Sequence, residues 1–317
     1  MLTPETCKFQ KIRNLGKEAA NTLSQSEEDI NMLDDLFKRF EGAYAENTLR
    51  AYRSDINDFI GWCEDHALPF DAVDGEDMAH YAEHLSETKS TATIRRRLMS
   101  VSSVLSLAQL TDNTRHPEVK LAMKRIHRQK GRAQLQASPL TREVKDKLVE
   151  VCSNDTRGLR DRVLLELGYE TMRRRAELCA FKFEDRITSP SGQQGLMMQF
   201  SKTDQFGRGK IISISNELSA LLDEWQAIAG NTGYILRGIT PDLSLNDQLS
   251  HASVNIILKR LQAEAELDIQ PSLSGHSFRV GRALDLLNEG ESLPKIMLRG
   301  GWSAESTVMR YLRAWEF

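Results

Sequence analysis

Apolar side chains recur at helical spacing through the first part of the chain. Leu33, Leu36, Phe37 and Phe40 follow the spacing that places residues on one buried face of a helix. Asn47 or Thr48, Ser90 or Thr91, and Pro117 are residue types that suit helix starts. Further helices are expected over 47–63, 77–85, 90–108 and 117–126. The pattern predicts a small all-helical bundle over residues 31–127, preceded by a weakly periodic extension over 1–30.

The pattern changes after this bundle. Residues 128–139 are polar and basic and are broken by Gly131, which predicts an interdomain linker. From 140 to 317, short strand signals lie among helical segments. Strands are expected at 185–187, 196–200 and 210–214, and helices at 141–151, 159–169, 217–229 and 250–265, with two more capped by Ser292 and Ser303. The predicted fold class is mainly α with a small antiparallel β-sheet, in two domains.

Composition narrows the class of protein. Hydrophobic residues make up 40% and charged residues 27% of the 317, a globular composition with room for two domains. No apolar run approaches the roughly 20 residues of a membrane span, and the N-terminal residues lack signal-peptide features. Four widely spaced cysteines (Cys7, Cys63, Cys152 and Cys179) form no C-x-x-C pair. We therefore expect reduced thiols in a cytoplasmic protein that does not enter membranes.

The distribution of charge points to an anionic partner more than its sum does. The formal net charge is −3, which by itself argues against nucleic acid. Between Lys89 and Arg132, however, eleven lysines and arginines face only two acids, Asp112 and Glu118. A local basic stripe on a near-neutral protein suits contact with a phosphate backbone.

The C-terminal stretch carries the candidate chemistry. His276 and Arg279 are three positions apart, so on a helix they share one face. Arg279 offers a planar set of donors that fits a phosphate, and His276 can exchange a proton near neutrality. Trp302 follows Gly300 and Gly301, and Tyr311 comes nine positions later. A tyrosine nucleophile has an ordinary pKa of about 10, so it needs a site that stabilises charge on its target.

This arrangement resembles the C-terminal signature of the tyrosine recombinases, or phage integrase family: H-x-x-R, then G-[HW], then Tyr nine residues on. The stretch T-M-R-R-R-A-E-L over 171–178 is similar to the family's first arginine motif, T-G-L-R-x-S-E-L. The resemblance maps the first catalytic arginine to Arg174, with Arg173 in place of the usual leucine. It also maps a catalytic lysine to Lys202, in S-K-T at the turn between the last two predicted strands. We expect lysine to be tolerated at Arg173 and Arg175 but not at Arg174.

The first domain adds to the resemblance. N-T-L-R-A-Y over 47–52, T-I-R-R-R-L over 93–98 and L-A-M-K-R-I over 121–126 are similar to segments of the core-binding, SAM-like domain of Cre-like recombinases. The resemblance implies that helices starting here enter the major groove, and that the two domains form a C-shaped clamp on DNA. The implied DNA-binding residues are Arg50, Arg53, Arg95, Arg96, Arg97, Lys124, Arg125, Arg128, His251 and Asn255. Three consecutive arginines at a helix start oppose the helix dipole, a cost that an anionic partner relieves.

The resemblance also implies a mechanism and an assembly. Arg174 and Arg279 would hold the non-bridging phosphate oxygens, while Lys202 would protonate the leaving 5′ oxygen. Tyr311 would attack and form a 3′-phosphotyrosine, and His276 would help deprotonate Tyr311 or bind the phosphate. Trp302 would donate to a phosphate oxygen, and Glu177 would orient the cations. The implied protein is a homotetramer that acts on inverted-repeat DNA sites through a Holliday junction, with no metal and no cofactor.

Three alternatives remain at this point, of which a telomere resolvase is expected to be a longer chain. A type IB topoisomerase shares this catalytic set but relaxes DNA as a monomer, and a DNA-binding relative without recombination activity would have lost one of the catalytic residues. One departure from many relatives is that only six residues follow Tyr311. The segment that would pack into a neighbouring protomer, and the role of residues 1–30, are left open by the sequence.

Overall fold

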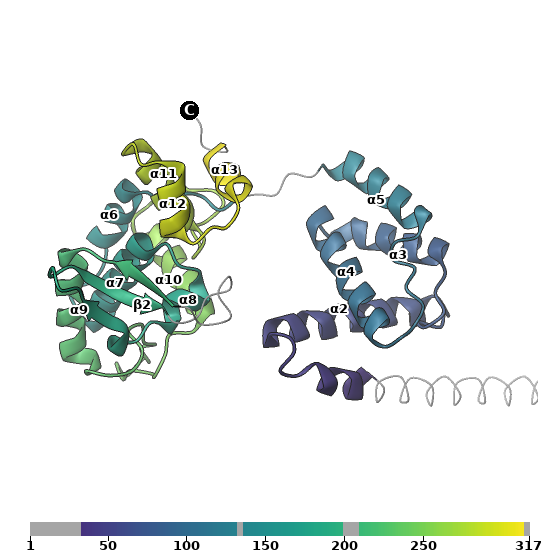
Figure 1. Ribbon diagram of the computed structural model, residues 1–317, viewed down its shortest axis with the longest axis horizontal. Helices are drawn as coiled ribbons and strands as arrows, with labels where there is room; N and C mark the ends of the chain where they lie inside the picture. The colour runs from purple at the N-terminus through teal and green to yellow at the C-terminus, as the bar shows by residue number, and fades with distance from the viewer. Residues whose placement is uncertain (1–32, 132–135, 199–208, 314–317) are drawn as a thin grey trace, which may run out of the picture. The chain divides into compact units, whose positions relative to one another are not determined.

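The computed structural model describes residues 33–131, 136–198 and 209–313 (Figure 1). The chain divides into two compact units between residues 134 and 135. Each unit has its own apolar core, so each is described by itself. None of the helices in these ranges combines the length and the hydropathy needed to cross a lipid bilayer.

The first unit is a helical bundle. A helix over 33–40 precedes its four longer helices, and α4 contacts α2, α3 and α5. Leu33, Leu36, Phe37 and Phe40, predicted to share one buried face, are buried, and Ile56 and Phe59 of α2 belong to the same cluster. The bounds are α2 (Glu46–Asp65), α3 (Gly75–Thr88), α4 (Thr91–Leu107) and α5 (Pro117–Lys130).

Helix starts in this unit follow local hydrogen bonding. Ser90 caps α4 by accepting from the amide of Thr93, and Pro117 opens α5, as the sequence predicts. The predicted cap of α2 is wrong, because the helix already starts at Glu46, after an extended Ala45 that provides no side-chain cap. Asn47 instead accepts a hydrogen bond of 3.3 Å from Arg50 through its amide oxygen.

The second unit places a small sheet beside a helical body. β1, β2 and β3 pair antiparallel in that order, with Ile187 opposite Gly195 and Leu196 opposite Ile212. Mixed helices and an antiparallel sheet agree with the predicted fold class. The bounds before the sheet are α6 (Arg142–Glu150), α7 (Thr156–Thr171), α8 (Arg175–Ala180) and a 3-10 turn η1 (Phe183–Asp185), and the strands are β1 (Arg186–Thr188), β2 (Gln194–Met198) and β3 (Lys210–Ser213). The helices after it are α9 (Asn216–Ala229), α10 (His251–Glu264), α11 (Ser277–Asn288), α12 (Leu293–Gly300) and α13 (Glu305–Arg313).

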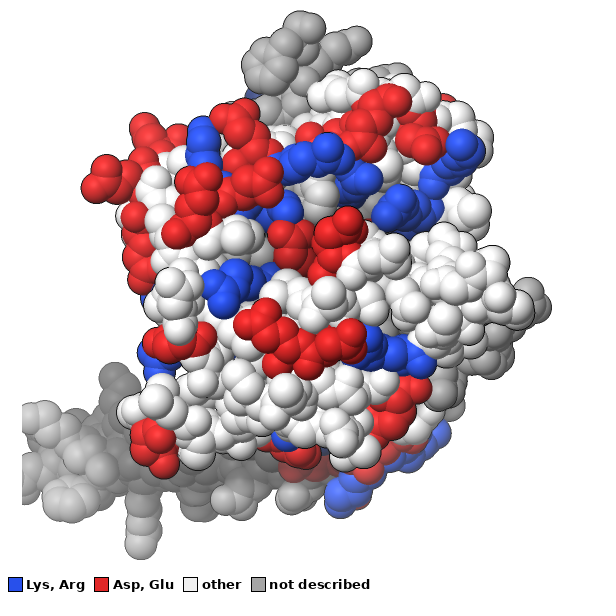
Figure 2. All heavy atoms as spheres, turned by 90° about the vertical axis from the view of Figure 1, so that its left-hand side faces the viewer, with Lys and Arg blue, Asp and Glu red and all other residues white. Residues whose placement is uncertain are grey.

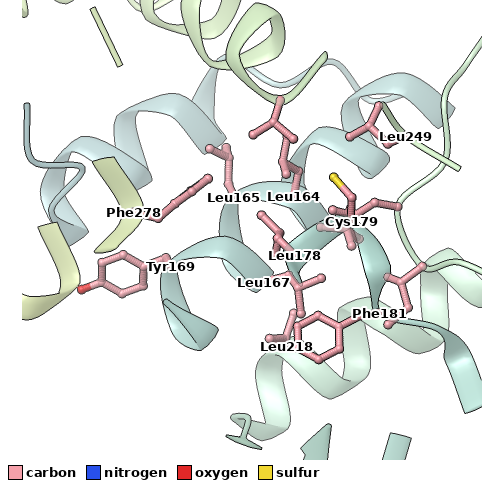
Figure 3. Packing of buried hydrophobic residues seen from close by; sticks show 14 of the residues in the cluster. Leu164, Leu165, Leu167, Tyr169, Leu178, Cys179, Phe181, Leu218, Leu249 and Phe278 are labelled. Atoms are coloured by element: carbon pink, nitrogen blue, oxygen red, sulfur yellow. The ribbon is translucent and has the colours of Figure 1, made fainter. Parts of the chain in front are cut away.

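The main core of this unit surrounds α7. Leu164, Leu165 and Leu167 lie on different sides of this helix and are all fully buried, as Figure 3 shows. Leucines buried on several sides of one helix require packed neighbours on each of those sides. Phe278 of α11 and Leu218 of α9 belong to the same cluster. Each such side chain contributes about 2 kcal/mol through burial, so α7 is the fixed centre of the unit.

Two glycines allow α11 to approach its neighbours closely. A Cβ on Gly168 of α7 would lie 2.7 Å from the ring of Phe278, and a Cβ on Gly281 would overlap the backbone carbonyl of Leu140. The amide of Leu140 donates to the carbonyl of Ser277 over 3.0 Å. The start of α11 is therefore held between α7 and the chain that enters the unit.

The predicted linker is too long at both ends. Arg128 lies inside α5, which continues to Lys130 and ends at Gly131, where φ is +74°. Ser138 is fully buried and its hydroxyl donates to the carbonyl of Pro271 over 2.7 Å. Both ends of the polar stretch therefore belong to packed structure, which composition alone did not reveal.

A smaller apolar cluster joins α11 to the last two helices. Its buried members are Met172, Ala283, Leu286, Ile296, Trp302, Val308 and Leu312. Ser292 occupies the N-cap position of α12, as predicted. The predicted cap of α13 is wrong, because the helix begins two residues after Ser303, at Glu305, and the carbonyl of Ala304 accepts the amide of Thr307.

Candidate active site

Arg174 stands at the junction between α7 and α8. Met172 ends α7 in the left-handed conformation, with φ 54° and ψ 33°, and Arg174 is extended at the N-cap of α8. Its Nη1 donates to Oε1 of Glu177 over 2.8 Å, and its backbone amide donates to Oε2 over 3.1 Å. The Glu177 side chain is 7% exposed and that of Arg174 is 33% exposed. A buried carboxylate thus orients a guanidinium that still faces solvent.

Arg279 enters the same region from the first turn of α11. Its side chain is 1% exposed, and its Nη1 donates to the carbonyl of Met172 over 2.6 Å. Its guanidinium carbon lies 4.5 Å from the centre of the Trp302 ring. The buried Nε has no hydrogen-bond partner among the described residues. An unpaired buried donor costs about 1–3 kcal/mol, and a phosphate oxygen would provide the missing acceptor.

His276, Trp302 and Tyr311 meet beside Arg279. The rings of His276 and Tyr311 are 5.0 Å apart in an edge-on arrangement, and those of Trp302 and Tyr311 are 6.1 Å apart. His276 is the residue just before α11, and Tyr311 lies on α13. The structure therefore brings these three residues and Arg279 together, with Arg174 close enough to lower the pKa of both His276 and Arg279.

The electrostatics of the site favour an anion. Burial lowers the pKa of Arg279 to about 10, and repulsion from Arg174 and Arg173 adds to this effect. The pKa of the His276 imidazole is lowered to about 4. Burial is the largest cause, and the charges of Arg279 and Arg174 contribute less. Perturbed groups of this kind cluster at functional sites. At neutral pH the imidazole is therefore uncharged, next to cations that need a negative partner.

Lys202, Lys210 and Arg173 are the remaining cations that the sequence or the structure places near the site. Lys202 lies outside the described residues. Lys210 on β3 donates through Nζ to the carbonyl of Leu298, and burial together with the charge of Arg173 lowers its pKa. Arg173 is 2% exposed and donates to two backbone carbonyls, those of Thr171 and Arg299. The expectation that Arg173 tolerates lysine stays untested, but these contacts argue against it, because lysine cannot donate to both carbonyls from a buried site.

Helix α4 holds the arginine triplet in different environments. Arg97 pairs with Asp58 and Asp55, and Arg96 also pairs with the fully buried Asp55. Arg95 is exposed and lines a shallow groove together with Tyr52 and Met99. Met99 is 70% exposed, which is unusual for a large apolar side chain. The face of α4 that bears Arg95 and Met99 is thus open, while Arg97 holds α4 to α2.

The other candidate DNA-binding residues lie on exposed helix positions or in local pairs. Arg50 pairs with Glu46 at 2.7 Å, and Arg53 pairs with Asp34 at 2.6 Å. Arg125 pairs with Glu83 at 2.7 Å, whereas Lys124, Arg128 and His251 are exposed. Asn255 is partly buried, and its side-chain oxygen accepts the amide of Gly275 over 2.9 Å, so it holds the loop before His276 against α10.

One face of the second unit does not fit a DNA backbone. Figure 2 shows the side on which α9 lies in Figure 1, where acidic and basic groups alternate over a largely uncharged surface. A phosphate backbone is bound by a surface of one sign. The catalytic candidates, with three arginines close together, provide that sign on their own part of the unit.

Comparison with known proteins identifies both units. The model of the phage integrase family matches residues 138–316, and the model of the phage integrase N-terminal SAM-like domain matches residues 33–109. An integrase/recombinase XerD homolog of Selenomonas ruminantium is 32% identical over 287 residues, which cover 87% of this chain and 84% of the relative. Recombinase Cre of Escherichia phage P1 is 26% identical over 309 residues, covering 91% and 90%.

Solved structures share the fold. A lambda integrase dimer bound to a COC′ core site superposes with a TM-score of 0.66 at 18% identity, over 90% of this chain and 96% of that one. A lambda integrase tetramer bound to a Holliday junction gives a TM-score of 0.65 at 18% identity, over 90% and 78%. These likenesses extend across nearly the whole chain.

Proposed function

The chain belongs to the phage integrase family, and from this premise we propose a mechanism in which it cleaves and rejoins DNA through a 3′-phosphotyrosine. As a tyrosine recombinase, it carries out site-specific recombination of DNA. The single observation that supports the mechanism best is that the rings of Tyr311, His276 and Trp302 lie together beside the buried guanidinium of Arg279.

In the proposed reaction, the phenol oxygen of Tyr311 attacks the phosphorus and the bond to the 5′ oxygen breaks. The phenol proton passes to the neutral imidazole of His276, whose pKa is lowered to about 4 before the phosphate binds. Arg174 and Arg279 form a phosphate clamp on the non-bridging oxygens, where charge rearranges in the transition state. The indole N–H of Trp302 donates to one of these oxygens. Lys202 donates the proton that the leaving 5′ oxygen needs, a role that rests on its motif.

The two units divide the work in this proposal. The first unit, over about residues 31–127, binds DNA through the open face of α4 and the start of α2, and the second unit carries the chemistry. The DNA-binding role of the first unit is supported best by the match of residues 33–109 to the SAM-like domain of phage integrases. By analogy with the lambda integrase tetramer bound to a Holliday junction, the protein acts as a homotetramer on inverted-repeat sites. The site of action is the cytoplasm of a bacterium, where such DNA is accessible.

The test is covalent capture. A duplex recovered from a random pool by binding to the protein is nicked near the expected cleavage point, so that cleavage releases a short strand and traps the adduct. The wild type should form a protein–DNA adduct on a denaturing gel, whereas Tyr311→Phe should bind the duplex equally well and form none. An adduct in Tyr311→Phe would assign the nucleophile elsewhere. Relaxation of supercoiled plasmid that lacks the selected sequence would instead favour a topoisomerase.

A further inference from the structure

Arg173 is a residue for which the sequence predicts no role in the site. The resembled motif has leucine here, and the residue sits one place before the clamp arginine Arg174. Its side chain is 2% exposed. Nε donates to the carbonyl of Thr171 over 2.6 Å, and Nη2 donates to the carbonyl of Arg299, which is 126 positions away in the chain. A guanidinium hidden this deeply, with its donors on main-chain oxygens, acts on the protein and not on DNA.

Lys210 approaches the same place from the sheet. It is the first residue of β3, it is partly buried, and its Nζ donates to the carbonyl of Leu298. The charge of Arg173 contributes to lowering the pKa of Lys210, so the two cations lie close to each other. Arg173 and Lys210 thus contact adjacent carbonyls from two different parts of the unit.

Those carbonyls belong to the last turn of α12. This helix ends at Gly300, and Gly301 follows in the left-handed conformation with φ +67°. The last carbonyls of a helix carry the negative end of its dipole, so cations placed there stabilise it. The carbonyl of Leu298 also accepts the amide of Gly301 over 3.3 Å. Trp302 follows immediately, and a Cβ on Gly300 would overlap its ring. The position of this helix end therefore fixes where Trp302 starts and where α13 can run.

We propose that Arg173 and Lys210 are positioning residues: together they form a clasp on the C-terminal carbonyls of α12 that sets Trp302 and Tyr311 opposite the Arg174–Arg279 clamp. The proposal rests on the proposed function, since it assigns Tyr311 the role of nucleophile. Arg173 is covalently adjacent to Arg174, so its bond to Arg299 ties the segment of the nucleophile directly to the clamp. A displacement of about 1 Å between reacting groups costs roughly 100-fold in rate.

The test compares single-turnover cleavage at saturating DNA. Arg173→Leu restores the residue of the resembled motif, which suits a buried site, and Lys210→Met keeps the length of the side chain without its charge. Each should lower the rate of adduct formation by roughly 30- to 100-fold, with DNA affinity and thermal midpoint close to wild type. Arg173→Lys keeps the charge but loses one of the two donors, so its rate should fall between those of Arg173→Leu and wild type. Arg175→Leu, on an exposed neighbouring position, is the matched control and should cleave at the wild-type rate.

A second substrate separates positioning from proton donation. With sulfur in place of the bridging 5′ oxygen, the leaving group is a thiolate that needs no general acid. The defects of Arg173→Leu and Lys210→Met should persist on this substrate, because the nucleophile is misplaced. Recovery of the wild-type rate would overturn the clasp, and for Lys210 it would indicate a proton donor.

The remaining outcomes are also decisive. A rate within threefold of wild type for Arg173→Leu on the oxygen substrate refutes the clasp, while adduct formation by the wild type keeps the proposed function intact. A loss of folding in both Arg173→Leu and Arg173→Lys that accounts for their lost rate would assign Arg173 to the core and also refute it. Absence of any adduct in the wild type would instead count against the proposed function, before the clasp is reached.

Discussion

The His276 imidazole should remain neutral to an unusually low pH. Its pKa is lowered from 6.5 to about 4, first by burial and then by the charges of Arg279 and Arg174. This lowering of the His276 pKa from 6.5 to about 4 corresponds to roughly 3 kcal/mol of preference for the neutral form. At pH 7 only about one molecule in a thousand would carry the imidazolium. His276 should therefore be uncharged when the phosphate site is empty, and its proton affinity should rise when a phosphate offsets the charges of Arg279 and Arg174.

Proton NMR of the histidine rings can measure this pKa. The chain has seven histidines, and the resonance missing from His276→Gln identifies the one of interest. Its midpoint should be near 4. Vanadate, as a phosphate mimic, should raise the midpoint by offsetting both arginine charges. Arg174→Gln should raise it less, because the larger charge contribution, that of Arg279, remains. A midpoint of 6 or above in the unliganded protein would show that the site is wetter than its geometry indicates, and would remove the electrostatic argument.

The same shift has a consequence for stability, with a definite sign. Between pH 6.5 and 4 the unfolded chain binds a proton at this residue that the folded chain does not. The stabilisation associated with the neutral ring is therefore complete above pH 6.5 and is lost as the pH falls towards 4, by up to about 3 kcal/mol. Urea denaturation of the second unit's transition should show a shallower decline with acid in His276→Gln than in wild type. Equal slopes in the two proteins would contradict the lowered pKa.

Two further predictions concern the arginines. Arg174→Lys should keep DNA affinity but lower cleavage by about 100-fold or more, because lysine cannot reproduce a two-pronged contact. Arg175→Lys should cleave normally. Wild-type adduct formation by Arg174→Lys would refute the clamp. Arg95→Ala should reduce the slope of log affinity against log salt by about 0.9. Arg97→Ala should chiefly lower the thermal midpoint, because Arg97 pairs with Asp55 and Asp58. An unchanged salt slope for Arg95→Ala would assign that residue to a solvated face.

Features that depend on neighbouring residues could be predicted from the sequence. Ser90, Thr141 and Ser250 each accept an amide three residues on, and each was expected at a helix start. The antiparallel strands follow the same rule, since alternation and turn residues lie close together in the chain. Ala45 and Ser303 show the limit of this reasoning, because boundaries shift by one or two residues when the backbone supplies its own hydrogen bonds.

Features that depend on distant contacts were less accessible. The spacing of His276, Arg279, Trp302 and Tyr311 indicated a shared site, and the fold does bring them together. Their catalytic roles stay predictions, as does that of Lys202, which lies outside the described residues. The buried position of Arg173 was missed. One side chain among three consecutive arginines is expected to be solvated, and its contact with the carbonyl of Arg299 cannot be predicted from neighbouring residues. Ser138 looked like linker for the same reason.

The two close approaches of α11 decide which side chains of the site are held in place. Gly168 and Gly281 let α11 press against α7 and Leu140 with no space for a methyl group, so His276 and Arg279 cannot shift without disturbing the main core. Tyr311 stands on α13, which is held by the smaller apolar cluster. When a scissile phosphate arrives slightly out of place, the arginines will not follow it. The bound DNA must instead bring its phosphate to them, so the packing of α11 against the core sets the position at which the strand is cut.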